Sequence, residues 1–332
     1  MFDAHGPIEI AGRGFFPDLP RAVASLNPGD VLRVHRSIEI SDSVTLVVPF
    51  RLEGANGTPQ IILRGILRSE RGMIVTQCDG RIRNIEFVGA RCLNGNGAGV
   101  WHERGRLVLE DCIFSGNQNG VLVADDATGS FSAAGCYFHR NGGGCGHTHA
   151  LYINRVASAR IYRCVFEETY AGHHIKSKAR ACEVRGNLFS GSPMSTTAYM
   201  IDFPYGGYNA VTRNIFIKPR DSMNRAFIAL HSAESRPQSP SARIENNIFI
   251  NYRRGLSVGV VNFSPRSSVV MRENAFERVS LPLLGRGRQK LRRDIRIAFA
   301  DGITKGLAND AETISDLGPP YHVTRRTERG AP

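Results

Sequence analysis

The stretch CVFEETYAGHHIKSKARACEVRGNLF, residues 164–189, decides the fold because it begins and ends with the same short pattern. The pattern is Cys or Asn, then any residue, then Phe. It occurs seven times, as Cys112-Ile-Phe114, Cys136-Tyr-Phe138, Cys164-Val-Phe166, Asn187-Leu-Phe189, Asn214-Ile-Phe216, Asn247-Ile-Phe249 and Asn274-Ala-Phe276. The intervals between the Phe residues are 24, 28, 23, 27, 33 and 27 residues. A unit of that length cannot bury its own apolar face, so its copies must stack as coils of a solenoid.

The residue types within the repeats predict strands. Short β-branched runs such as Gly120-Val-Leu-Val123 and Ser268-Val-Val-Met271 lie between Gly and Asn residues, and no apolar spacing of helical period is sustained across them. We therefore predict an all-β, right-handed, single-stranded parallel β-helix of about 10–12 coils. The Cys and Asn residues of the pattern are expected to form internal columns at a spacing of roughly 4.8 Å. A buried amide in such a column must bond its neighbours, because an unpaired one is costly.

Both ends of the chain differ from the repeats. Residues 18–26 are amphipathic and are expected to form a helix, with a turn at Asn27-Pro-Gly-Asp30. A terminal coil exposes strand edges, so a covering helix is expected there. We predict an N-terminal cap at residues 1–30, the β-helix at 31–282 and a basic C-terminal cap or tail at 283–332. The basic run at residues 286–293 is interpreted as a solvated face of that cap.

The charge balance favours anionic partners. The 332 residues contain 42 Lys and Arg against 30 Asp and Glu, a net charge of +12. Such a field attracts polyanions, namely nucleic acid, an anionic membrane or an acidic polysaccharide. Nucleic acid is the least favoured, because the chain has one tryptophan, Trp101, and no recognisable nucleic-acid module. Lysine is rare against this arginine background, and its five positions are Lys176, Lys178, Lys218, Lys290 and Lys305.

Cysteine usage and the N-terminus leave the compartment open. Three of the seven cysteines occupy equivalent repeat positions, which predicts a stack of thiols acting as small apolar groups. The first residues lack the pattern of a signal peptide, and no apolar run reaches membrane-spanning length. A monomer without a membrane span is expected. It is cytoplasmic as the sequence stands, or periplasmic or secreted if a leader was trimmed.

Successive central coils can be aligned by strand alternation. Placing Leu151, Ile175 and Ile201 inward brings Tyr152, Lys176 and Asp202 into one outward column. His174 falls in a flanking outward column of the same alignment. Further polar and aromatic residues lie close to this column in the sequence, and we predict that they bind substrate: His149, His173, Lys178, Tyr205, His231 and Glu234.

The residue types of the column suit β-elimination from a uronate sugar. That reaction needs a base for the proton beside the carboxylate, a cation for the resulting enolate and an acid for the leaving oxygen. Lys176, His174 and Tyr152 are expected to divide these roles, with Asp202 orienting Lys176 or binding sugar hydroxyls. The histidines have no matching set of carboxylates or cysteines, so no metal site is predicted.

The opening LPRAVASLNPGDVLRV and the Asn-x-Phe coils resemble the pectate-lyase-like superfamily of β-helix proteins. The stretch HHIKSKARACEVRGNLF resembles chondroitinase-B-type and related alginate lyases. That resemblance implies that Lys176 is the base, that an Arg on the next coil is the acid and that calcium neutralises the carboxylate. Here His173 and His174 occupy the positions of the acidic calcium ligands, and Asp202 lies on the coil where the Arg is expected.

A second resemblance is to a broader group of bacterial β-helix proteins with a Gly-His-x-x-Lys-Ser motif and a following Pro-x-Gly-Gly coil. In this chain they are Gly172-His-His-Ile-Lys-Ser177 and Pro204-Tyr-Gly-Gly207. This resemblance implies a polysaccharide-related role without a defined reaction.

Several functions remain open at this point. A lyase acting on an acidic polysaccharide is the leading hypothesis. A uronate epimerase needs nearly the same residues, and a glycoside hydrolase needs two opposed carboxylates. A non-catalytic glycan-binding or assembly protein is the third class. The glycan itself, and whether cleavage is internal or from an end, do not follow from the sequence.

Overall fold

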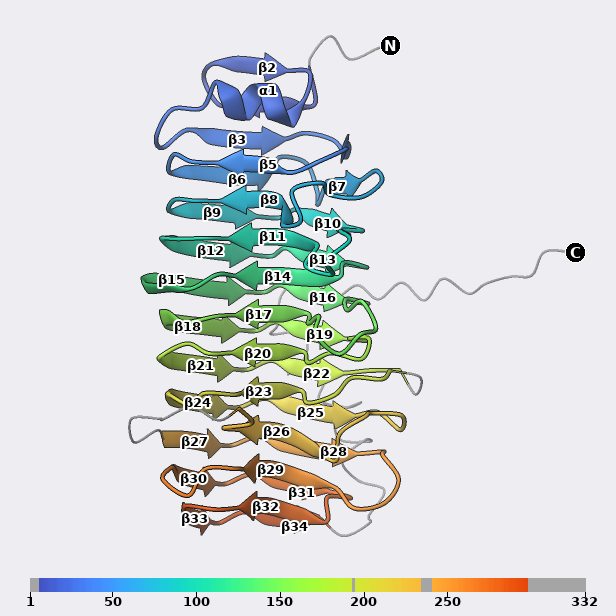
Figure 1. Ribbon diagram of the computed structural model, residues 1–332, viewed down its shortest axis with the longest axis vertical. Helices are drawn as coiled ribbons and strands as arrows, with labels where there is room; N and C mark the ends of the chain where they lie inside the picture. The colour runs from blue at the N-terminus through green and yellow to red at the C-terminus, as the bar shows by residue number, and fades with distance from the viewer. Residues whose placement is uncertain (1–5, 193–194, 234–240, 298–332) are drawn as a thin grey trace, which may run out of the picture. The chain divides into compact units, whose positions relative to one another are not determined.

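A computed structural model of the chain describes residues 6–192, 195–233 and 241–297. Its strands form three sheets of 13, 11 and 10 strands, and the chain visits the sheets in turn on each coil (Figure 1). The repeats therefore build the predicted parallel β-helix.

The thirteen-stranded sheet contains the first strands of the chain. Its members are β1 (Ile8–Ile10), β2 (Gly14–Phe16), β3 (Val31–Val34), β6 (Phe50–Gly54), β9 (Gly80–Arg83), β12 (Arg106–Glu110), β15 (Asp126–Ala134), β18 (Val156–Tyr162), β21 (Ala181–Arg185), β24 (Tyr208–Thr212), β27 (Ser241–Glu245), β30 (Ser268–Arg272) and β33 (Arg288–Arg292). Strand β1 pairs antiparallel with β2 and β3, and from β3 onward the pairing is parallel.

The eleven-stranded sheet carries the Phe residues of the repeat. Its members are β4 (Ile38–Ile40), β7 (Gln60–Leu63), β10 (Glu86–Val88), β13 (Ile113–Ser115), β16 (Tyr137–His139), β19 (Val165–Glu167), β22 (Leu188–Ser190), β25 (Ile215–Lys218), β28 (Ile248–Asn251), β31 (Ala275–Glu277) and β34 (Ile295–Ile297). Its Phe rings stack with centroids 4.6–5.2 Å apart, from Phe87 to Phe276. These rings fill the core of the β-helix.

The ten-stranded sheet holds the candidate site. Its members are β5 (Val44–Leu46), β8 (Gly72–Thr76), β11 (Ala98–His102), β14 (Asn119–Val123), β17 (Leu151–Ile153), β20 (Ile175–Ser177), β23 (Ile201–Phe203), β26 (Ala226–Leu230), β29 (Val258–Asn262) and β32 (Leu281–Gly285). These ten strands are separated by nine turns of the chain, slightly fewer than the 10–12 coils predicted.

The cap at the N-terminus is the expected helix. Helix α1 (Leu19–Ala24) begins after Asp18, whose carboxylate accepts the backbone N–H of Arg21 at 2.8 Å. Leu19 and Ala22 are buried on its inner face, and the helix packs against β1, β2 and β5. It therefore covers the first coils with an apolar face and removes their edge from solvent.

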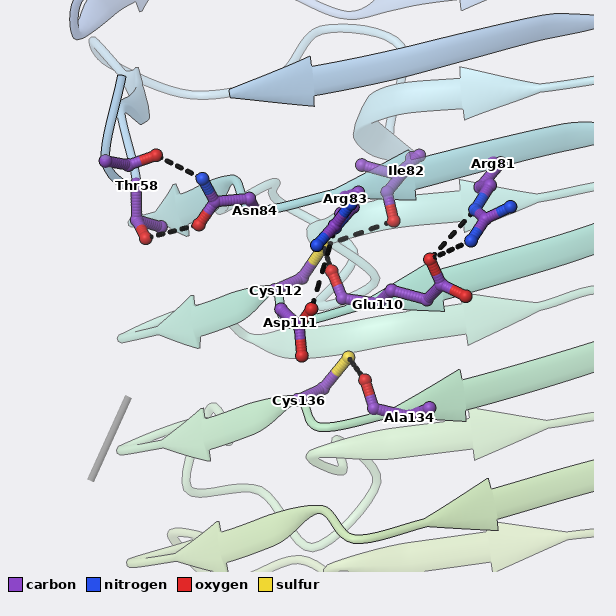
Figure 2. Close-up of polar contacts among 11 residues, drawn as sticks. Thr58, Arg81, Ile82, Arg83, Asn84, Glu110, Asp111, Cys112, Ala134 and Cys136 are labelled. Atoms are coloured by element: carbon purple, nitrogen blue, oxygen red, sulfur yellow. Dashed lines mark hydrogen bonds and ion pairs between the residues drawn. The ribbon is translucent and has the colours of Figure 1, made fainter. Parts of the chain in front are cut away.

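The inner columns differ between the two halves of the β-helix. In the first half Cys112 and Cys136 are buried thiols that donate to carbonyl oxygens, as Figure 2 shows for the bonds to Ile82 and Ala134. Burial raises the pKa of both thiols. In the second half the amides form a ladder: Asn187 Nδ2 donates to Asn214 Oδ1 at 2.9 Å, and the same bond recurs between the following pairs. The structure thus confirms both predicted columns.

The β-helix extends beyond the predicted boundary at residue 282. Strands β32, β33 and β34 form a further coil that ends at Ile297, so the basic run at 286–293 belongs to β33 and its flanks. The sequence pattern of the repeat is absent from this coil, because Asp294 stands in the Asn position. Its carboxylate accepts a hydrogen bond from Asn274 Nδ2 at 2.9 Å. The remainder of the predicted cap lies outside the described residues.

Candidate functional site

Three neighbouring strands of the ten-stranded sheet place the predicted column in register. Tyr152 on β17 pairs with Lys176 on β20, and Lys176 pairs with Asp202 on β23. The inward neighbours of the column are buried, which is why alternation turns these three side chains to the outer face. The alignment made from the sequence is confirmed at these strands.

Two lysines converge on the phenol of Tyr152. Lys178 Nζ donates to Tyr152 Oη at 2.5 Å and to Asn154 Oδ1 at 2.9 Å. The Nζ atoms of Lys176 and Lys178 lie 5.4 Å and 4.9 Å from the centroid of the Tyr152 ring. Partial burial raises the pKa of Tyr152, and the charge of Lys176 opposes that rise. The phenol therefore remains protonated at neutral pH, where it accepts from one ammonium group and can donate its own proton.

A second tyrosine extends the cationic cluster. Tyr205 follows β23, and its ring centroid lies 5.4 Å from Lys178 Nζ and 5.3 Å from Arg155 Cζ. Arg155 also lies 3.6 Å from a carboxylate oxygen of Asp125. Tyr205 is one of the predicted substrate-binding residues, whereas Asn154 and Arg155 were not predicted as site residues. Their position in the sequence could have indicated them, because Asn154 and Arg155 directly follow β17 just as Lys178 directly follows β20.

Asp202 is deeply buried on this face. Only 3% of the residue is exposed, and its Oδ1 accepts the hydroxyl of Ser232 at 2.5 Å. Burial raises the pKa of Asp202, while the Ser232 bond and the two lysines oppose the rise. The register places this carboxyl beside Lys176, as predicted. Its burial suits it to positioning Lys176 more than to binding a sugar directly.

His149 and His173 form a buried aromatic stack next to the column. Their ring centroids are 4.8 Å apart, and Tyr199 continues the stack at 5.4 Å from His173. Burial lowers the pKa of His173 to about 3 and that of His149 well below its usual value. His173 Nε2 lies 3.6 Å from Asp202 Oδ2, but an uncharged imidazole forms no ion pair with it. The prediction that His149 contacts substrate is wrong in its geometry, because only 1% of it is exposed.

His174 lies inside the β-helix, not on the outer face as predicted. It is completely buried, its Nδ1 is 2.7 Å from Thr169 Oγ1, and its ring contacts those of Phe166 and Phe189. Burial lowers its pKa to about 3. The assumed alternation fails here because His174 precedes β20 at a corner, where consecutive residues both point inward. His174 is thereby removed from the catalytic candidates.

The two remaining candidates lie after β26. His231 is partly buried, its Nδ1 has no hydrogen-bond partner in the described chain, and burial lowers its pKa. It sits beside Ser232, whose hydroxyl bonds Asp202, so it borders the site. Glu234 lies outside the described residues.

The polar column is confined to three coils. The residues in register on either side of it are Trp101 and Leu122 in one direction, and Ala229 and Val261 in the other. Lysine, tyrosine and carboxyl groups thus interrupt an otherwise apolar outward column. Such an interruption on a regular sheet marks the site more clearly than any single residue does.

The described residues offer no ready-made metal site. No group of three or more His, Cys, Asp or Glu side chains in residues 6–192, 195–233 and 241–297 is arranged to hold a metal ion. The donor set at the column consists of one buried carboxyl, two ammonium groups and a phenol, which does not fit the calcium site that the lyase resemblance implies. Within the same ranges, no helix is long and apolar enough to cross a membrane.

Comparison with known proteins adds little to this description. No protein-family model matches the chain, and no curated protein matches it. Five chains of solved structures match, among them ORF18 of Geobacillus virus E2, with 15% sequence identity and a TM-score of 0.49. The match covers 84% of this chain and 58% of the viral one, so this chain spans little more than half the length of that protein. At this level the likeness carries no information about activity.

Proposed function

We propose that the protein cleaves an acidic, uronate-containing polysaccharide by β-elimination at the Tyr152–Lys176–Lys178 cluster. The observation that carries the proposal is the convergence of two lysine side chains on one partly buried phenol. Lys178 supplies a cation for the carboxylate of the sugar, Lys176 supplies an amine that can act as base, and the phenol beside them supplies a proton donor.

Each group has a distinct part in the proposed reaction. The free amine of Lys176 takes the proton beside the sugar carboxylate, and the C–H electron pair forms the new C=C bond. The bond to the leaving glycosidic oxygen breaks, and that oxygen takes the proton of Tyr152. Lys178 stabilises the negative charge on the carboxylate and then on the phenolate. Lys176 then releases a proton to solvent, and the phenolate of Tyr152 takes a proton from solvent, which restores both groups.

Asp202 acts as a positioning residue in this scheme. Its carboxyl is held by Ser232 and lies in register with Lys176. In the proposed reaction this carboxyl keeps the Lys176 side chain in place beside the substrate. An epimerase reaction would use the same groups and return the proton to the opposite face of the sugar.

Non-catalytic glycan binding is the second candidate. This candidate is favoured by the hydrogen bonds among the site residues themselves, because Lys178 donates to Tyr152 and to Asn154. Tyr152 and Tyr205 also offer aromatic surfaces flanked by cations, which suits a saccharide held without turnover.

The test is a cleavage assay on a panel of alginate, polygalacturonate, hyaluronan and chondroitin sulfate. The ultraviolet absorbance of unsaturated uronate ends is followed for the wild type and Lys176→Ala, with and without chelator. Lys290→Ala on β33 is the matched control, because that lysine is exposed on a different sheet. Absorbance that is lost only in Lys176→Ala supports the proposal. Binding without any new double bond or reducing end would replace it with the second candidate.

A further inference from the structure

A hollow of about 470 Å³ opens where three strands of the eleven-stranded sheet end, away from the Tyr152–Lys176–Lys178 cluster. It lies after β22, β25 and β28, and its lining residues are Gly191, Ile217, Pro219, Arg220 and Tyr252. Its volume falls within the range of roughly 300–1,000 Å³ that small-molecule sites occupy. Gly191 has no room for a side chain, because a Cβ there would lie 2.7 Å from Ser195 Cβ and 3.3 Å from Pro219 Cγ.

One wall of the hollow is an aromatic ring. The backbone N–H of Tyr252 bonds the carbonyl of Lys218 at 3.0 Å, which continues the coil ladder and directs the side chain outward. The residue is 41% exposed, and Arg278 Cζ lies 5.4 Å from its ring centroid. An exposed aromatic ring beside a proline offers an apolar platform for the C–H face of a sugar.

One arginine, Arg220, lines the hollow, and two further arginines lie near the lining residues in the sequence. Arg220, Arg225 and Arg254 are exposed on the connections that follow β25 and β28, and none of their guanidinium groups pairs with a carboxylate within the described chain. The acidic residue nearest to them in sequence is Asp221. A guanidinium group binds a carboxylate through two parallel bonds, so the unpaired Arg220 beside an aromatic wall suits a carboxylated sugar.

The hollow and the candidate site are connected through the same turn of the β-helix. The connection from β22 to β23 supplies Gly191 to the hollow and Tyr199 to the ring stack on His173. Arg225 occupies the equivalent corner one coil later, since Met223 N–H bonds the carbonyl of Thr197 at 3.1 Å.

We infer that the hollow at Tyr252 is a second binding site for an acidic polysaccharide, holding a uronate several units away from the one at Lys176. The inference depends on the proposed function only for the choice of ligand. The occupant is a polyuronate rather than a nucleic acid or an acidic peptide, because the site offers one sugar-sized aromatic platform beside one unpaired guanidinium group.

The test measures the dissociation constants of the full-length protein for alginate, polygalacturonate and hyaluronan. Measurements are made in the wild type and in a Lys176→Ala background, where the proposed reaction is blocked. Tyr252→Ala and Arg220→Ala are expected to weaken binding by about five-fold to ten-fold, as the loss of an aromatic or charged contact does. Tyr208→Ala and Arg160→Ala are matched controls, because both residues are exposed on the thirteen-stranded sheet.

The outcomes separate this inference from the proposed function. Weaker polyuronate binding in both hollow variants, with unchanged controls, supports the second site even if Lys176→Ala has no effect on cleavage. Unchanged binding in both hollow variants overturns the second site even if Lys176→Ala abolishes cleavage. Tighter binding of single-stranded DNA than of every polyuronate overturns the choice of occupant, as does a failure to bind any of the three. Neutral dextran is the negative probe.

Discussion

The two halves of the β-helix share one coil framework but carry very different charge. Residues 1–150 contain 14 Lys and Arg against 15 Asp and Glu, whereas residues 151–300 contain 24 against 10. In the first half, arginines contact carboxylates on the neighbouring coil, as Arg81 does with Glu110 (Figure 2). In the second half, Arg220, Arg225 and Arg254 have no such partner within the described chain. The net charge of +12 is therefore a property of one half and not of the whole surface.

The residue types that line the interior also change near the middle of the chain. The inner column holds cysteines at 112, 136 and 164 and then changes to asparagines from residue 187 onward. The outward column changes one coil earlier, from Trp101 and Leu122 to Tyr152 and Lys176. Phe stacking continues through both halves. The comparison teaches that the apolar core sets the fold throughout, while the polar groups of the candidate site are concentrated in the second half.

The largest expected effect compares two aromatic residues of one outward column. We expect Tyr152→Phe to lower the rate of polyuronate cleavage by about 10²-fold to 10⁴-fold, because it removes the proton donor. Trp101→Phe, two strands away in the first half, should leave the rate unchanged. Initial rates of ultraviolet absorbance at saturating substrate measure both. Equal losses in the two variants would contradict the assignment of the reaction to the second half.

The inner columns should differ in their contribution to stability. The amide of Asn214 donates to Val184 O and Asn247 Oδ1 and accepts two bonds from Asn187. Asn214→Leu leaves buried partners unpaired and should lower the free energy of unfolding by about 2–4 kcal/mol. Cys136→Ala removes one small apolar group and should cost about 1 kcal/mol. Urea unfolding followed by circular dichroism compares them, and equal costs would show that the amide ladder adds no stability beyond packing.

A buried lysine in the second half should make the stability of the protein depend on pH. Lys218 is completely buried, bonds Ser222 Oγ at 3.1 Å and lies 4.9 Å from the Phe227 ring centroid. Burial, assisted by the charge of Arg253, lowers its pKa from 10.5 to about 7. At pH values between these two pKa values, the Lys218 amine is protonated in the unfolded chain but not in the folded chain. Stability should therefore rise with pH across this window, by at most about 1.4 kcal/mol per pH unit, and this contribution should be flat below pH 7.

The variant Lys218→Met isolates that effect. It keeps a side chain of similar length without a titratable group, so the rise between pH 7 and 10 should disappear and stability at pH 7 should increase. Lys290→Met on the exposed strand β33 is the control. Unfolding free energies from urea titrations at several pH values give the slope, and a slope that persists in Lys218→Met would assign it to other groups.

The sequence predicted whatever depends on strand alternation and on the repeat. The inward residues Leu151 and Ile175 were placed correctly, and the register of Tyr152, Lys176 and Asp202 follows from them. The cap helix could be recognised because Asp18 and the following proline mark its start. These features are local or periodic, so a single sequence contains the information.

The errors lie at corners and in disguised repeats. His174 was placed on the surface because alternation was extended through a corner, where the chain turns and neighbouring residues both point inward. His149 was chosen for its proximity in the sequence to the column, and the structure buries it. The coil with Phe87 fell within the predicted β-helix, but its pattern went unrecognised because Ile85 stands in the Cys or Asn position. The last coil was left out of the β-helix because Asp294 stands in that position. The contact of Arg155 with Tyr205 joins two loops on different coils, and no spacing in the sequence specifies their conformation.

The smallest expected effect concerns the paired arginines of the first half. Arg81 donates to Glu110 at 2.8 Å from Nε, on a strand surface where both side chains are partly exposed (Figure 2). Solvent and salt screen such a pair, so Arg81→Ala should change the free energy of unfolding by about 1 kcal/mol or less. The affinity for polyuronate should not change, because Glu110 already neutralises the guanidinium group. Dissociation constants for alginate at low and moderate salt check this, with Arg220→Ala as the contrasting variant. A loss of affinity in Arg81→Ala as large as that in Arg220→Ala would mean that the polyanion follows the overall charge and not the second half.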